Sequence, residues 1–291
     1  MKDKAGRLVH VKLVVVAAMW GGTFIATKMA ASVFGSFTGA TLRYLFALVL
    51  MVPMLYLQNK GAFKINRQQF SKFFVLGLSG IFAYSFFFFT GLRHVQASHG
   101  ALIVALNPVM VMILSAAINR ESIKPIRLLG VALSLSGTAL VISRGHPADL
   151  FTMFGWGDAL MLGCPVSWAI YTYFAKDALA VASPLQASTW AILLGLLLIL
   201  FFVPFESYPP VVDVKVWIAL IYLGVCGSFL GFVWYYQGIS KIGPVKTSAY
   251  NNLIPVFAML LSVLILGETI AAHTLYGSAL VVGGVYLVNR Y

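Results

Sequence analysis

Apolar runs long enough to cross a lipid bilayer recur along nearly the whole of this 291-residue sequence. A transmembrane helix needs about 20 mostly apolar residues to span ~30 Å of hydrocarbon. The chain is 60% hydrophobic and 10% charged, with a mean hydropathy of +0.92, and one soluble core could not bury that much apolar surface. The sequence therefore predicts an all-α integral membrane protein.

The turn-forming and charged residues between the runs predict ten transmembrane helices. The first half gives Val11–Ala31, Phe37–Leu57, Phe70–Leu92, Ser98–Ile118 and Arg127–Ser143. The second half gives Trp156–Phe174, Leu185–Phe205, Val216–Gly238, Val245–Leu266 and His273–Asn289. The connections are too short for an extramembrane domain, so we expect function to lie among the helices.

The formal charge of +12 comes from Lys and Arg in short clusters between the apolar runs. Such clusters are typical of topology signals, whereas a nucleic-acid-binding protein gathers them on one exposed face. With the N-terminus inside, fifteen Lys and Arg fall on the inner side and five on the outer side. The positive-inside rule then predicts both termini in the cytoplasm, in a bacterial-type inner (plasma) membrane.

The only two cysteines, Cys164 and Cys226, each lie inside an apolar run. This placement favours packing roles over a disulfide or a metal site. No nucleotide-binding loop or metal-ligand spacing is present, so we expect no cofactor and no metal. The expected partners are a small-molecule solute and the lipid bilayer, not nucleic acid, and a monomer is the simplest assembly.

An internal repeat is the most specific feature of the sequence. A constant offset of 147 residues, with no gap, pairs Gly91 with Gly238, Pro108 with Pro255, Glu121 with Glu268, Gly130 with Gly277, and Gly137 with Gly284. Upstream, Trp20 and Lys28 correspond to Trp168 and Lys176. Two five-helix repeats, residues 1–144 and 145–291, are predicted, and because five is odd they enter the membrane from opposite sides.

Several motifs occur in the order and spacing of a known family. They are Trp20-Gly-Gly-Thr-Phe-Ile-Ala-Thr-Lys28, Thr41-Leu-Arg-Tyr44, Gly157-Asp158 before Trp168, and the duplicated Glu121 and Glu268. The chain resembles the EamA-type transporters of the drug/metabolite transporter superfamily. That resemblance implies a basket of ten helices whose helices 1, 3, 4, 6, 8 and 9 line a central cavity, and export of amino acids or other metabolites. Arg120 departs from the Gly that often precedes the Glu, whereas Gly267 keeps it.

The candidate binding residues are uncharged, and the asparagines among them lie near the equivalent prolines. Pro108 and Pro255 each interrupt a helix at membrane depth, which often marks a binding site but can also be a packing kink. Neighbouring amides and aromatic rings could hold a zwitterion or a cation, or could serve helix packing and lipid contact. The candidates are Trp20, Thr23, Tyr84, Phe88, Asn107, Trp168, Tyr171, Tyr235, Asn251 and Asn252.

Charged side chains are expected only near the helix ends. No Asp or Glu falls near the middle of a predicted span, which argues against a buried carboxylate of the kind that couples drug export to protons. Lys28 and Lys176 are expected to reach the interface, with contact to a substrate anion as the alternative. Arg43 is expected to cap or pair near the outer surface, and His99 begins the fourth span.

These observations favour a secondary transporter that exports a small neutral or zwitterionic metabolite such as an amino acid. Uptake of a small cation such as choline is the alternative within transport, because the aromatic residues would suit it. An intramembrane enzyme would need a nucleophile and base, or paired carboxylates, at depth. Neither is evident in the sequence, so no enzyme activity is expected.

Overall fold

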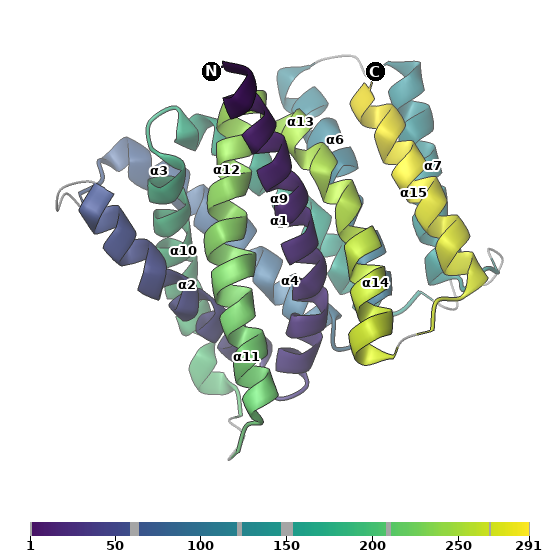
Figure 1. Cartoon of the computed structure of the whole chain (residues 1–291), viewed down its shortest axis with the longest axis horizontal. Coiled ribbons are helices and arrows are strands. Elements are labelled where there is room, and N and C mark those ends of the chain that lie inside the picture. Colours follow the sequence, from purple (N-terminus) through teal and green to yellow (C-terminus); the bar gives the residue numbers. More distant parts are fainter. Residues whose placement is uncertain are drawn as a thin grey trace.

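The computed structural model describes residues 2–58, 64–120, 124–146, 154–207, 211–267 and 269–290. Within these ranges all regular structure is helical, as predicted. Figure 1 shows the helices as one bundle, with the two ends of the chain on the same side. An even number of crossings would place them so.

The elements of the first half are α1 (Lys2–Ala31), α2 (Ser36–Gln58), α3 (Arg67–Leu76), η1 (Gly77–Ala83), α4 (Tyr84–Gly91), α5 (Ala97–Val104), α6 (Asn107–Asn119) and α7 (Pro125–Ile142). Those of the second half are α9 (Trp156–Leu179), α10 (Pro184–Leu200), η3 (Val203–Phe205), α11 (Val214–Tyr222), η4 (Leu223–Leu230), α12 (Gly231–Ile242), α13 (Pro244–Ser248), η5 (Ala249–Leu253), α14 (Ile254–Leu266) and α15 (Ala272–Arg290). Each predicted span coincides with one helix or with a run of successive helices.

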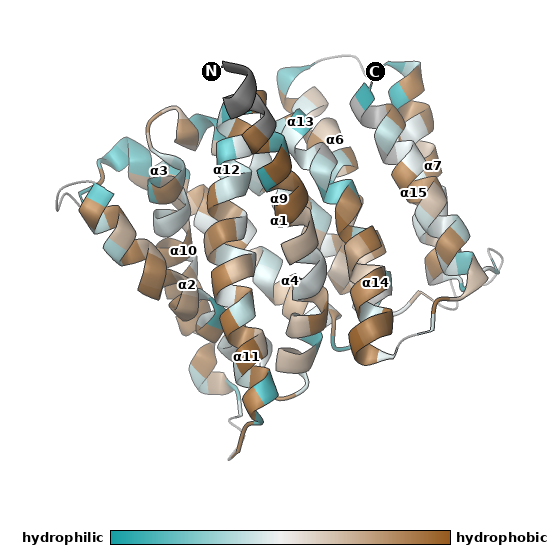
Figure 2. Cartoon of the chain, viewed as in Figure 1, coloured by the Kyte–Doolittle hydropathy of each residue, from teal (hydrophilic) through white to brown (hydrophobic). Residues whose placement is uncertain are grey.

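The outer surface of the bundle is apolar, as a lipid-facing surface must be. Large side chains such as Val49, Leu197 and Leu264 are 69%, 65% and 79% exposed. Soluble proteins rarely expose so large an apolar surface to water. In Figure 2 hydrophobic colour dominates the middle of the bundle and hydrophilic colour gathers near helix ends such as those of α3 and α11. The protein is therefore a multi-pass membrane protein.

Length and hydropathy support most of the predicted spans individually. Among the described residues, seven helices are long and apolar enough to cross a membrane, and Pro125–Val141 is a shorter apolar helix. The helices α9 and α15 do not meet that criterion. The number of ten crossings therefore stays a prediction.

The two halves share irregular local features at the same offset. Both contain a π-helical segment in the third span, η1 at 77–83 and η4 at 223–230. In both, the fourth span breaks and a new helix starts one residue before the proline, at Asn107 and Ile254. The equivalent glutamates, Glu121 and Glu268, lie outside the described residues.

The last helices of the two halves, α7 and α15, show that the repeats are inverted. A methyl group added at Gly137 would lie 2.5 Å from the Gly277 carbonyl oxygen, and one at Gly284 would lie 2.4 Å from that of Gly130. Contacts that pair 137 with 277 and 130 with 284 require antiparallel helices. The equivalent residues Ser134 and Val281 meet at the crossing, where the Ser134 hydroxyl donates to the Val281 carbonyl over 3.4 Å. A pseudo-two-fold axis passes between them.

The halves also interlock through their second and third spans. A methyl group at Gly224 in η4 would lie 2.8 Å from the Arg43 carbonyl oxygen on α2. Likewise, one at Gly77 in η1 would lie 2.8 Å from the Ala191 carbonyl oxygen on α10. Each second helix thus packs on the π-helical segment of the other half, and Arg43 and Ala191 occupy equivalent positions.

Candidate functional site

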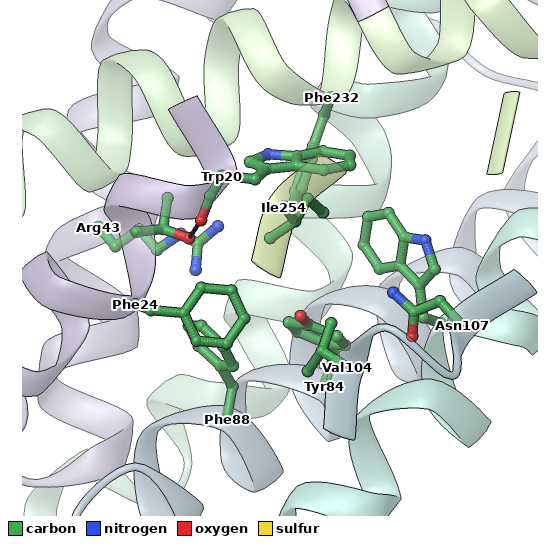
Figure 3. A pocket seen from close by; sticks show the side chains of 11 residues that line it. Trp20, Phe24, Arg43, Tyr84, Phe88, Val104, Asn107, Phe232 and Ile254 are labelled. Carbon is green, nitrogen blue, oxygen red and sulfur yellow. Dashed lines mark hydrogen bonds between the residues drawn. The ribbon is translucent and has the colours of Figure 1, made fainter. Parts of the chain in front are cut away.

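A small cavity lies at the centre of the bundle, between the two repeats (Figure 3). Its volume is about 20 Å³, which holds roughly one water molecule. The lining residues are Trp20, Thr23, Phe24, Arg43, Tyr84, Phe88, Val104, Asn107, Trp168, Phe232 and Ile254. They come from the first, second, third, fourth, sixth, eighth and ninth spans. The family resemblance implied this set of spans except the second.

The structure brings six of the ten candidate residues to this cavity. They are Trp20, Thr23, Tyr84, Phe88, Asn107 and Trp168. The remaining four do not line it. Tyr171 and Tyr235 are buried behind Trp168, with ring centroids 4.9 and 5.4 Å from it. Asn251 is buried and Asn252 is half-buried away from the cavity lining.

The equivalent tryptophans Trp20 and Trp168 meet across the repeat interface. Their ring centroids are 5.2 Å apart and the planes are nearly perpendicular, at 88°, an arrangement that aromatic pairs favour. The Trp20 indole N–H donates to the Gly227 carbonyl oxygen in η4 over 2.9 Å, and the Trp168 indole N–H donates to the Tyr235 hydroxyl over 3.3 Å. These bonds fix the orientation of both rings, and both indoles also pack against Phe232 and Tyr235.

The break in the fourth span supplies the amide of the site. Pro108 has no N–H, so the carbonyl of Val104 loses its helical donor, and the chain makes a turn before α6 begins at Asn107. Asn107 is 2% exposed and its side-chain oxygen has no hydrogen-bond partner. An unsatisfied buried acceptor costs about 1–3 kcal/mol. The equivalent residue in the second half is the apolar Ile254, so the amide is present on one side only.

Arg43 is not near the outer surface, and that prediction is wrong. It is 3% exposed and its guanidinium group lines the central cavity. Its Nε donates to the Ser228 hydroxyl over 2.7 Å, and its Cζ lies 5.4 Å from the Tyr44 ring centroid and 5.9 Å from that of Phe232. One guanidinium nitrogen, Nη1, is buried without a partner.

The contacts of Arg43 do not fully compensate the free-energy cost of burying its charge. Contact with aromatic faces contributes about 2 kcal/mol in a desolvated site, whereas burying an uncompensated charge costs several kcal/mol. Among the described residues, no carboxylate forms an ion pair with Arg43. The cavity therefore has a positive wall.

A larger hollow of about 540 Å³ lies at the end of the bundle opposite the termini. There His99 on α5 and Asp158 at the start of α9 approach within 3.2 Å and link the two repeats. Asp158 also accepts the Gly155 backbone N–H over 2.9 Å, which caps α9. Lys28 and Lys176 lie in the last turns of α1 and α9, outside the central cavity.

Sequence reasoning missed five lining residues: Phe24, Arg43, Val104, Phe232 and Ile254. Helical spacing could have identified Phe24, because it follows Trp20 by four residues and lies on the same helix face. The repeat offset could have identified Ile254 from Asn107. The signal for Arg43 was its depth, seven residues into a helix that begins at Ser36.

The inverted repeats and the small cavity at the paired helix breaks suit a membrane solute carrier. A sequence model described as the EamA-like transporter family matches residues 8–143 and again residues 155–290. The chain belongs to the EamA-like transporter family. The two matches fit the two structural repeats.

Individual relatives are similar over most of their length. The chain is 29% identical to the uncharacterized transporter YyaM of Bacillus subtilis (strain 168), covering 95% of this chain and 92% of that protein. It is 28% identical to a probable terminal-alkyne amino-acid exporter of Streptantibioticus cattleyicolor, covering 74% and 71%. A protein of known crystal structure shares the fold, with a TM-score of 0.69 at 20% identity and coverage of 98% of this chain and 99% of that chain.

Proposed function

We propose that this protein is a secondary transporter that exports a small neutral or zwitterionic metabolite, such as an amino acid, by alternating access. The observation that carries the proposal is the buried cavity where both repeats break, lined by aromatic faces, an unpaired amide oxygen and a guanidinium group. Aromatic faces and amides bind uncharged and zwitterionic groups without a fixed counter-charge. The similarity to the probable terminal-alkyne amino-acid exporter of S. cattleyicolor supports the same class.

Alternating access is supported by the inverted symmetry. When two repeats are related by an axis in the membrane plane, the contacts that close one side have equivalents that can close the other. The cavity of about 20 Å³ is smaller than any amino acid. We propose that this is a closed form, and that movement at the breaks before Pro108 and Pro255 opens it.

Orientation follows from the basic residues. We propose that the repeats divide near residue 144 and that the protein lies in the bacterial inner membrane. We also propose that both termini are cytoplasmic. The support is the excess of Lys and Arg on the side that carries the termini. A reporter fused to the C-terminus that is active in the periplasm would contradict this orientation.

Counterflow in proteoliposomes tests the transport proposal. Vesicles loaded with unlabelled L-amino acids should take up the external labelled amino acid faster than empty liposomes, and faster than choline-loaded vesicles take up labelled choline. Replacing Asn107 by Leu should reduce that exchange at least about tenfold, since an amide contact is lost. Membrane abundance should stay near that of the wild type. Faster exchange of choline than of any amino acid would favour uptake of small cations instead.

The direction of transport needs intact cells. Cells fed dipeptides accumulate amino acids internally, and expression of the protein should increase the amount released into the medium. Faster accumulation from the medium, without faster release, would contradict export.

A further inference from the structure

We infer that Arg43 is the anion-binding group of this transporter, and that it restricts the transported solute to molecules with a carboxylate or an equivalent anionic group. The inference rests on the proposed function, because it assigns a chemical class to the solute of the same cavity. The names of the similar proteins assign no role to Arg43.

The first step is the burial of the guanidinium group. Arg43 is 3% exposed, and a guanidinium group stays charged at every relevant pH. Its charge cannot be relieved by losing a proton, in contrast to that of a buried lysine or histidine. A charge at this depth is rare in membrane proteins and usually faces a pathway for a solute or ion.

The second step is that some guanidinium atoms of Arg43 have partners in the protein and one nitrogen does not. Ser228 on η4 holds Nε at 2.7 Å, and the rings of Tyr44 and Phe232 flank the group. These contacts position the guanidinium group but carry no negative charge. Nη1 remains buried without a partner. The described residues therefore orient Arg43 and leave a donor for something else.

The third step is where that donor lies. Figure 3 shows the Arg43 guanidinium group entering the cavity from one side, while the Asn107 amide stands on the other, with aromatic rings between them. The unpaired Asn107 oxygen can accept from an ammonium group, and ring faces attract cations. A guanidinium donor facing an amide acceptor is complementary to the carboxylate and ammonium of a zwitterion.

The fourth step is the asymmetry of the site. The scaffold is symmetric, yet the position equivalent to Arg43 is Ala191 and the position equivalent to Asn107 is Ile254. Both polar groups come from the first repeat and stand on opposite sides of the cavity, so a solute meets a different group at each side. Such a cavity orients a zwitterion with an apolar side chain in a single direction. It disfavours a choline-like cation, which would lie beside an uncompensated positive charge.

Two matched ligand series test this inference by thermal stabilisation of the purified protein. One series is L-leucine, isopentylamine and 4-methylpentanoate, and the other is L-phenylalanine, phenethylamine and 3-phenylpropanoate. In each, the three compounds share a side chain and carry both charges, the cation alone or the anion alone. Ligands that bind only the folded state raise its stability by mass action. In the wild type, the zwitterion and the anion should bind more tightly than the amine in at least one series.

The variant Arg43→Gln should lose that preference. Its apparent affinity for the zwitterion and the anion should fall at least about tenfold, as expected for one lost charge-assisted hydrogen bond, with no loss for the amine. Arg43→Lys should keep part of the preference. Lys215→Gln, which removes an exposed charge at the start of α11, should behave as the wild type.

The outcomes separate this inference from the transport proposal. The role of Arg43 would be overturned if the wild type bound the amine at least as tightly as the zwitterion. It would also be overturned if Arg43→Gln kept the carboxylate preference. Either result would count even if amino acids exchange in counterflow. Absence of carboxylate binding would overturn it too. Conversely, a carboxylate preference lost in Arg43→Gln would establish the anion site even if counterflow of amino acids failed. If Arg43→Gln does not fold, the wild-type series and Arg43→Lys decide.

Discussion

At the scale of single residues, the backbone conformation accounts for the departure of Arg120 from the family pattern. Arg120 ends α6 with a φ of 53°, and Gly267 ends α14 with a φ of 66°. Both are left-handed caps, which glycine adopts freely and other residues adopt at a cost of about 1–2 kcal/mol. The substitution at position 120 therefore changes the energy of the turn and not its shape.

This pair of equivalent caps predicts opposite effects of substitution. Arg120→Gly should raise the free energy of unfolding by about 0.5–1 kcal/mol, because it relieves the strained cap. Gly267→Ala should lower it by about 1 kcal/mol, since nothing within 4 Å blocks the added methyl group and backbone strain is the only effect. Thermal unfolding in detergent checks both. If Arg120→Gly and Gly267→Ala shift the midpoint in the same direction, the cap explanation is wrong.

At the scale of helices, close glycine contacts hold α7 against α15. Without a hydrophobic driving force between helices in lipid, small residues that allow close approach supply much of the packing energy. The contacts of Gly137 with Gly277 and of Gly130 with Gly284 are the two symmetric copies of one contact. The sequence showed these glycines as repeated positions but did not show that the two helices pack on each other. Which helices become neighbours depends on three-dimensional packing.

Glycines on these helices offer a matched comparison. Gly137→Ala should lower the free energy of unfolding by about 1–3 kcal/mol, since its methyl group would lie 2.5 Å from the Gly277 carbonyl oxygen. Gly283→Ala on α15 meets nothing within 4 Å, and should be neutral or stabilising by up to about 1 kcal/mol, because alanine favours the helix. Equal destabilisation by the two substitutions, measured by thermal unfolding, would show that the close contact is not what matters.

At the scale of the whole molecule, the sequence predicted the helical class, the duplication and its inversion, because hydropathy and repeat spacing act over many residues. It located the fourth and ninth spans and the proline interruption in each, but not the residue at which the new helix begins. It also identified six cavity residues, since aromatic and amide residues at duplicated positions stand out. It missed Arg43, because an arginine near the start of a span is usually interfacial. It included Tyr171 and Asn251, because spacing alone does not separate the cavity lining from the layer behind it.

The central claim is that a solute binds between the repeats, and ligand-dependent tryptophan fluorescence tests it most directly. The titrant is the L-amino acid that exchanges fastest in counterflow, and the variants are Trp20→Phe, Trp168→Phe and Trp156→Phe. Trp156 is 71% exposed at the start of α9 and serves as the control. The account predicts a saturable signal in the wild type and in Trp156→Phe that is weakened in Trp20→Phe and Trp168→Phe. A signal that both cavity variants retain in full, with unchanged affinity, would contradict binding between the repeats.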